Sequence, residues 1–163
     1  LGCNSSVSLS FVSTISVVVI FGSSYNKTID DLLPFETRFM GALHDGIAIS
    51  LLYNSASVFC IPSVAENFAN TILEAINCHT PVVGFNVGGI PDIVDDEVTG
   101  LIAEAGDAQS LADSLGRLLK DKDLATIFGE NGRKKLLEKY TEKSFERTLS
   151  ETLTQTVGGA SLV

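Results

Sequence analysis

The sequence predicts an α/β fold in which helices cover both faces of a parallel sheet. Short apolar runs rich in Val, Ile and Phe alternate with longer segments of helical periodicity, and Gly or Pro follows several of the runs. Such alternation is typical of parallel sheets, because each crossover between parallel strands needs room for a helix. The chain has 163 residues, of which 45% are apolar. This is enough for one domain that buries about two-thirds of its unfolded surface.

Gly, Pro and polar residues that interrupt the apolar pattern predict where each strand and helix lies. Strands are predicted near residues 17–21, 37–40, 57–61, 81–85 and 100–103, and helices near 46–55, 70–78, 108–120, 123–139 and 143–155. Asp107 and Asp123 are placed to cap the starts of two of the helices, because Asp favours the N-cap position. Residues 1–16 fit no element, whereas the Gly-rich residues 158–163 are predicted to form a flexible tail. The predicted domain therefore spans residues 17–157.

Charge excludes one broad class of partner. The net charge is −9, and nine of the eleven Lys and Arg residues lie between Arg117 and Arg147, interleaved with acids. This pattern is typical of a solvated helix face. A protein that grips nucleic acid needs a basic surface to neutralise phosphates, so no nucleic-acid partner is expected.

Neither a membrane span nor a metal site is expected. The apolar stretch from Leu9 to Phe21 is interrupted by Ser and Thr and is shorter than the roughly twenty residues of a membrane-spanning helix. Three cysteines, Cys3, Cys60 and Cys78, are an odd number without the paired spacing of metal ligands. We therefore predict reduced thiols in a cytoplasmic protein, with no bound metal.

The most informative segment contains two acids eight residues apart. Glu66 follows the predicted strand that stops at Pro62, and Glu74 falls in the first turn of the helix expected near residues 70–78. In open α/β sheets, ligands bind at the carboxyl ends of the strands, and a helix N-terminus there attracts an anion. Acids on either side of an anion site suit a ligand that carries hydroxyl groups. A sugar linked to a diphosphate meets both requirements.

Each of these signals also has a purely structural interpretation. Thr71-x-x-Glu74 is a possible capping box, in which Glu74 returns a hydrogen bond to the start of the helix. Glu66 alone is typical of a solvated loop acid. Gly88–Gly89 suits either a turn before a helix that starts at Pro91 or a close backbone approach, since both favour glycine.

Five blocks of sequence together resemble one enzyme family. The blocks are Glu66-x7-Glu74-Ala75, Thr80-Pro81-Val82-Val83, Val87-Gly88-Gly89-Ile90-Pro91-Asp92-Ile93-Val94, Thr99-Gly100-Leu101-Ile102 and Asp107-x3-Leu111-Ala112. Their order and spacing resemble the retaining nucleotide-sugar glycosyltransferases of family 4, also called group 1. The sequence between Glu66 and Glu74 is similar to that of one branch of this family, whose enzymes build bacterial capsule, exopolysaccharide and lipopolysaccharide. The resemblance extends over roughly residues 17–147.

The resemblance implies a role for each matching residue. Glu66 would be the catalytic acid that binds hydroxyls of the donor sugar, and Glu74 the acid that binds the ribose. Backbone N–H groups would face the sugar and diphosphate, namely those of Phe68, Ala69, Asn70 and Thr71. A loop with Met40, Gly41 and Ala42 would lie near the base, and Gly88 and Gly89 would border the pocket. Such enzymes retain the anomeric configuration without a protein nucleophile, and neither a cofactor nor a metal is implied.

The resemblance also implies a larger protein. It assigns the chain to the carboxyl-terminal, Rossmann-like half of a two-domain GT-B glycosyltransferase, with a glycan or lipid-linked acceptor bound through an amino-terminal domain. The parent would be cytoplasmic, either free or peripheral at the membrane. No Lys or Arg lies between Phe39 and Gly116, and the cations that the family uses for the diphosphate lie upstream of the strand at 17–21. We therefore expect this chain alone to be inactive or to bind donor weakly.

Two other functions are alternatives to sugar transfer. A non-catalytic module that binds a nucleotide or a sugar phosphate would use the same fold, and it stays open as the alternative. A dinucleotide-dependent oxidoreductase needs a Gly-x-Gly-x-x-Gly turn after its first strand, and Phe21-Gly22-Ser23-Ser24 does not supply one.

Overall fold

The computed structural model describes residues 17–22, 31, 35–141, 144 and 146. Its named elements are β1 (Val17–Phe21), β2 (Glu36–Gly41), α2 (Gly46–Ser55), β3 (Phe59–Ile61), α3 (Asn70–Asn77), β4 (Val82–Phe85), α4 (Ile90–Ile93), β5 (Gly100–Ala103), α5 (Ala108–Lys120) and α6 (Lys122–Lys139). Segment 1–16 and the tail at 158–163 lie outside the described residues. So does the predicted helix at 143–155, apart from Ser144 and Glu146.

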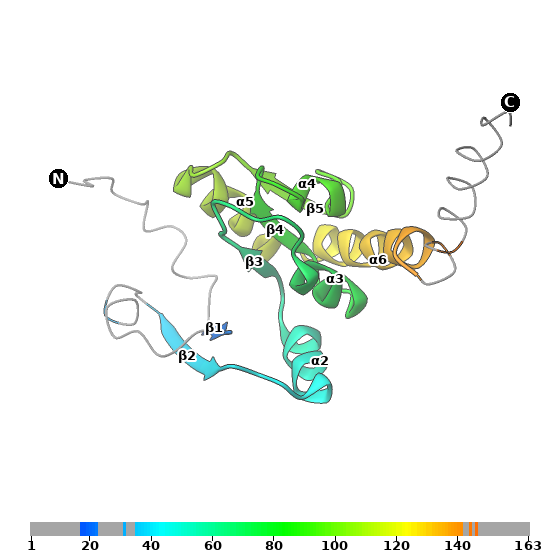
Figure 1. Cartoon of the computed structure of the whole chain (residues 1–163). Helices are drawn as coiled ribbons and strands as arrows, with labels where there is room; N and C mark the ends of the chain where they lie inside the picture. Colours follow the sequence, from blue (N-terminus) through cyan, green and yellow to red (C-terminus); the bar gives the residue numbers. More distant parts are fainter. Residues whose placement is uncertain (1–16, 23–30, 32–34, 142–143, 145, 147–163) are drawn as a thin grey trace, which may run out of the picture.

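The strands are parallel, as predicted, but they form two sheets where the sequence predicted one. β1 pairs with β2, while β3, β4 and β5 form a second sheet in that order. Figure 1 shows the β1–β2 pair standing apart from the sheet that carries α3 and α5. Aromatic side chains, rather than backbone hydrogen bonds between strands, link the two sheets. The ring of Phe21, at the end of β1, lies 6.3 Å from the ring of Phe59 in β3, measured between centroids.

Strand β4 is the centre of the larger sheet, and helices cover it on both faces. All four of its residues are buried. Val82 packs in one apolar cluster with Ile72 and Ile76 of α3. Val83 belongs to a second cluster with Leu118 of α5 and Phe128 of α6. Successive side chains of a strand point to opposite faces, so α3 covers one face and the α5–α6 pair the other.

Helix starts confirm one predicted cap and correct another. Asp107 is the N-cap of α5, and its side chain accepts hydrogen bonds from the N–H groups of Gln109 and Ser110. Helix α6 begins at Lys122, with Asp121 rather than Asp123 as its N-cap. Asp123 instead lies in the first turn, where a carboxylate still interacts favourably with the helix dipole.

Lys135 of α6 is buried and ties this helix to the end of α4. Its ammonium donates to the carbonyl oxygens of Asp92 (3.2 Å) and Ile93 (2.8 Å) and to Oδ1 of Asp95 (2.9 Å). The carbonyls at a helix C-terminus carry partial negative charge, which a cation stabilises. Helix α6 thus caps the C-terminal end of α4.

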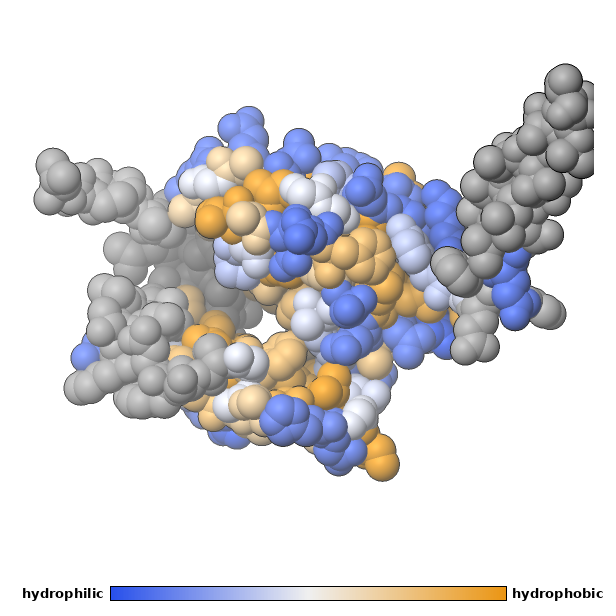
Figure 2. Space-filling model, viewed as in Figure 1, coloured by the Kyte–Doolittle hydropathy of each residue, from blue (hydrophilic) through white to orange (hydrophobic). Residues whose placement is uncertain are grey.

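Helix α2 exposes two large apolar side chains. Ile47 and Leu51, one turn apart on this helix, are 72% and 66% exposed, and Figure 2 shows orange surface at the corresponding lower edge of the molecule. Among the helices that the structure describes, none is both long enough and apolar enough to cross a bilayer.

We predict that Lys135→Ala lowers the free energy of unfolding by about 2–3 kcal/mol, because it leaves the α4 carbonyls without their charged donor. Urea denaturation followed by circular dichroism measures the change. Lys134→Ala is the matched control, since Lys134 is exposed and its loss should cost about 0.5 kcal/mol or less. Equal losses for the two variants would contradict the assigned role of Lys135.

Candidate functional site

The loop that carries Glu66 runs from the end of β3 to the start of α3. The Glu66 side chain is half-buried, and its Oε1 accepts a hydrogen bond from the N–H of Asn67 at 3.1 Å. Its other carboxylate oxygen, Oε2, bonds to no residue that the structure describes. One oxygen of Glu66 is thus used to orient the side chain, and the other remains free to accept from a ligand hydroxyl.

Gly88 and Gly89 press directly against this loop. The N–H of Gly89 donates to the carbonyl oxygen of Glu66 at 3.3 Å. A Cβ atom on Gly88 would lie 1.5 Å from that oxygen, and one on Gly89 would lie 2.2 Å from the carbonyl oxygen of Asn67. Gly89 is also the N-cap of α4, with Pro91 in the first turn. The two glycines therefore form a turn and a close approach at once, and the approach is to the protein's own backbone.

Helix α3 starts without a side-chain cap. Its N-cap is Ala69, which is buried and makes no side-chain hydrogen bond, and Asn70 and Thr71 are its first two residues. The N–H of Ile72 already bonds to the Ala69 carbonyl at 2.9 Å, whereas the first N–H groups of a helix have no partner within it. The N–H groups of Asn70 and Thr71 are therefore available to an anion.

Two expectations about Glu74 are corrected by this helix start. Thr71 is the second helical residue and not the N-cap, so the capping box does not form. Glu74 is the fifth residue, which places it in the second turn rather than the first. Its side chain lies on the same face of α3 as Asn70, one turn away, because residues i and i+4 are neighbours on a helix.

Glu74 has a partner that the sequence did not reveal. The hydroxyl group of Tyr53, on α2, donates to Glu74 Oε2 at 3.3 Å. Tyr53 is only 1% exposed, and burial, with a smaller contribution from the negative charge of Glu74, raises the pKa of the phenol. Tyr53 is therefore a neutral hydrogen-bond donor at all physiological pH values.

Phe68 connects the Glu66 loop to the end of α6. It is 46% exposed, and its ring lies 6.3 Å from the ring of Tyr140, whose hydroxyl donates to the carbonyl oxygen of Asp92 at 3.0 Å. The Glu66 loop is thus anchored both at the start of α4, through Gly89, and near its end, through Tyr140. Tyr140 and Lys135 were not among the site residues predicted from the sequence. For Lys135, its helical spacing from the buried residues Phe128 and Gly132 was a usable signal.

The predicted base-side loop is partly a strand. Met40 and Gly41 form the end of β2, and only Ala42 follows it. Gly41 has a φ of +64°, and its carbonyl oxygen accepts from the N–H of Gly22 at 2.8 Å. Strand pairing therefore continues further than the sequence predicted.

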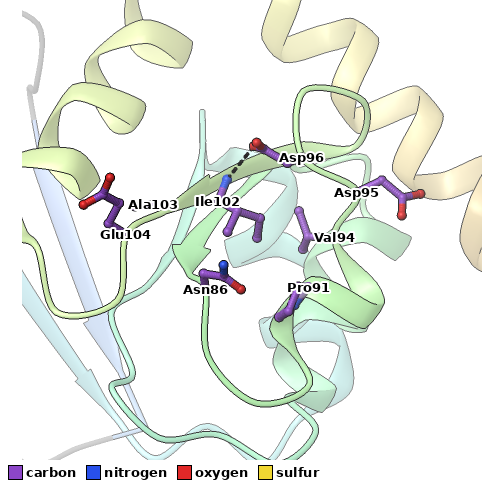
Figure 3. Close-up of a pocket in the computed structure, with 8 residues that line it drawn as sticks. All are labelled: Asn86, Pro91, Val94, Asp95, Asp96, Ile102, Ala103 and Glu104. Carbon is purple, nitrogen blue, oxygen red and sulfur yellow. Dashed lines mark hydrogen bonds between the residues drawn. The ribbon is translucent and has the colours of Figure 1, made fainter.

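A pocket of about 440 Å³ opens beside α4. Figure 3 shows its lining residues, which are Asn86, Pro91, Val94, Asp95, Asp96, Ile102, Ala103 and Glu104. Gly88 and Gly89 lie between Asn86 and Pro91 along the chain but do not line it. Three of the lining side chains are carboxylates, which would repel a diphosphate. The start of α3 is the better position for phosphate groups.

No group of three His, Cys, Asp or Glu side chains in the described parts of the chain could hold a metal ion. The structure is an α/β domain with parallel strands, and in such domains ligands bind at the loops that follow the carboxyl ends of the strands. The sequence profile of the family described as "Glycosyl transferases group 1" matches residues 17–135. The chain belongs to this family.

Three similar proteins illustrate the relationship. The capsular polysaccharide biosynthesis glycosyltransferase CapM of Staphylococcus aureus is 36% identical over 91 residues, which are 56% of this chain and 24% of CapM. The C-terminal domain of the group 1 glycosyl transferase LpcC of Francisella tularensis is 27% identical, with a TM-score of 0.62 over 71% of this chain and 60% of that chain. Anabaena Alr3699/HepE, solved in complex with UDP-glucose, shares the fold at 24% identity, with a TM-score of 0.68 over 79% of this chain and 35% of that chain.

These matches confirm the predicted family and the predicted fold, the carboxyl-terminal half of a GT-B glycosyltransferase. The matched segment spans about a quarter of the length of CapM.

We predict that Gly88→Ala destabilises the protein by roughly 2 kcal/mol more than Gly106→Ala. Both glycines have positive φ, but a methyl group at Gly88 would collide with the Glu66 carbonyl, whereas nothing lies within 4 Å of one at Gly106. The control therefore carries only the conformational cost of about 1–2 kcal/mol. Urea denaturation measures both variants, and equal costs would show that the two loops are not packed together.

Proposed function

We propose that this chain is the donor-binding half of a glycosyltransferase that moves a sugar, with retention of configuration, from a nucleoside diphosphate to a growing glycan. The observation that supports the proposal is the packing of the Gly88–Gly89 turn against the Glu66 loop, which fixes the segment that leads into the uncapped start of α3. Membership of the group 1 family supports the same conclusion.

The geometry of α3 suits the three parts of such a donor. The diphosphate would accept hydrogen bonds at the helix start, from the N–H groups of Asn70 and Thr71. Glu66 would bind hydroxyls of the sugar. Glu74 lies four residues into the helix, about 6 Å along its axis at 1.5 Å per residue. The acids then stand on either side of the phosphates, with Glu74 on the ribose side.

The shortage of positive charge at the site limits how tightly the chain alone can bind a diphosphate. A diphosphate carries about two negative charges, whereas a helix N-terminus supplies about half a positive charge. The ammonium of Lys135 is occupied by the end of α4 and by Asp95. We therefore propose that cations from another part of the enzyme complete the site, and that donor affinity of the isolated chain is weak.

The proposed reaction breaks the bond between the anomeric carbon and the diphosphate oxygen, and forms a bond from that carbon to an acceptor oxygen. The acceptor proton passes to the departing diphosphate. Neither a metal nor a cofactor is needed for this balance. The relationship to CapM supports a capsule, exopolysaccharide or lipopolysaccharide product, made in the cytoplasm, with the acceptor bound by an amino-terminal domain.

We predict that Glu66→Gln, in a two-domain enzyme that contains this chain, lowers the rate of sugar transfer at least about 100-fold, because a neutral amide is a weaker acceptor for donor hydroxyls. Transfer from radiolabelled UDP-, GDP- and ADP-sugars to a membrane extract measures the rate. Glu130→Gln, an exposed change on α6, is the control and should leave it unchanged.

Two results would count against the proposal. Near-normal transfer by the Glu66→Gln enzyme would remove this acid from the mechanism. Tight donor binding by a wild-type enzyme that transfers no sugar to any acceptor would favour the non-catalytic binding module instead.

A further inference from the structure

Tyr53 occupies the point where the two sheets and two helices meet. Its ring packs edge-on against Phe21 of β1 and Phe59 of β3, with centroid distances of 5.6 Å and 5.4 Å. Its carbonyl oxygen accepts from Oγ1 of Thr80 at 2.8 Å. Contacts on three sides therefore fix both the backbone and the ring of this residue.

Because the ring of Tyr53 is fixed, its hydroxyl group can reach one hydrogen-bond partner. A buried tyrosine hydroxyl normally finds a hydrogen-bond partner, because leaving it unpaired is costly. Within the described part of the protein that partner is Glu74 Oε2. Glu74, in contrast, lies on the exposed face of α3 and bonds to no other described residue. A long exposed side chain of this kind samples several rotamers unless something restrains it.

We infer that Tyr53 is a positioning residue that holds the Glu74 carboxylate ready for the ribose of the donor. This inference rests on the proposed function, because it takes Glu74 to be the ribose-binding acid. Tyr53 engages Oε2 only, and an ionised carboxylate offers about four acceptor sites on its two oxygens. Oε1 therefore stays available to the ribose hydroxyls, and the Tyr53 bond reduces the entropy that Glu74 loses when it binds them.

The length of the bond agrees with this role. At 3.3 Å it is longer than the roughly 2.7–2.8 Å usual between hydroxyl groups and oxygen acceptors. A bond of this length is weak, so it limits the rotamers of Glu74 while leaving most of the acceptor capacity of the carboxylate to a ligand. The charge remains available to a ligand.

A purely structural role for Tyr53 makes a different prediction, and ribose chemistry separates the two. Tyr53→Phe keeps the ring and its aromatic contacts but removes the hydroxyl. If the hydroxyl positions Glu74, the variant loses affinity for ligands that carry ribose hydroxyls and keeps its affinity for ligands that lack them. If Tyr53 only packs the core, both kinds of ligand weaken equally.

The experiment compares UDP, GDP and ADP with their 2′-deoxy and 3′-deoxy analogues on the 163-residue chain, by ligand-observed magnetic resonance titration. We expect the wild-type chain to bind at least one ribonucleotide roughly tenfold more tightly than a deoxy form, as a hydrogen bond to a carboxylate allows. In Tyr53→Phe this ratio should fall to about threefold or less. In Glu74→Gln the ratio should also fall, and adding Tyr53→Phe to it should change the ratio no further.

Ser55→Ala is the matched control, because it removes a hydroxyl of the same helix, α2, that bonds to the Leu52 carbonyl rather than to Glu74. It should leave the ribose ratio at its wild-type value.

The outcomes test the role of Tyr53 separately from the proposed function. A tenfold wild-type ratio that Tyr53→Phe leaves unchanged would overturn the positioning role of Tyr53 and leave the proposed function intact. A wild-type ratio of one would overturn the assignment of Glu74 to the ribose, and the role of Tyr53 with it. If the chain alone binds no nucleotide, the same titrations are made on a two-domain enzyme that contains it, where absence of nucleotide binding would overturn the proposed function.

Discussion

The site depends on a single contact between two backbone segments. The turn at Gly88–Gly89 lies so close to Glu66 and Asn67 that no side chain fits between them. This contact joins the loop after β3 to the loop after β4, two loops at the carboxyl ends of neighbouring parallel strands. Without it, Glu66 would lie on an unsupported surface loop. With it, the loop that carries Glu66 is held in place just before the start of α3.

Helix α4 connects the Gly88–Gly89 turn to Lys135 and Tyr140. It has four residues, and a helix of this length is not stable in isolation. Its start carries the glycine turn, while Lys135 and Tyr140 hold its last carbonyls. A buried ammonium is costly unless it is fully paired, so the arrangement of α6 and α4 is strictly defined. The side chains of α6 therefore fix the Glu66 loop indirectly.

Tyr53 combines the stability of the fold with the organisation of the site. Its ring fills the space between the sheets, and its hydroxyl reaches Glu74 on the surface of α3. The two acids are thus supported by different parts of the molecule, Glu66 by α4 and α6, and Glu74 by α2. Both acids are therefore held by contacts with rigid elements. Preorganisation of this kind lowers the entropic cost of binding.

Local signals in the sequence determined the five strands, the helices α2, α3, α5 and α6, the parallel pairing, the Asp107 cap and, through ordered motifs, the family. These features arise from side-chain periodicity and from short-range hydrogen bonds, which residues near one another in the chain decide. Only the tertiary structure decided that the strands divide into two sheets, that no side chain caps the start of α3, and that Glu74 meets Tyr53, a residue 21 positions away. The contacts of Lys135 with α4 span 42 and 43 positions. Such contacts depend on how whole elements pack, because distant residues meet only after the core has fixed the helices and strands that carry them.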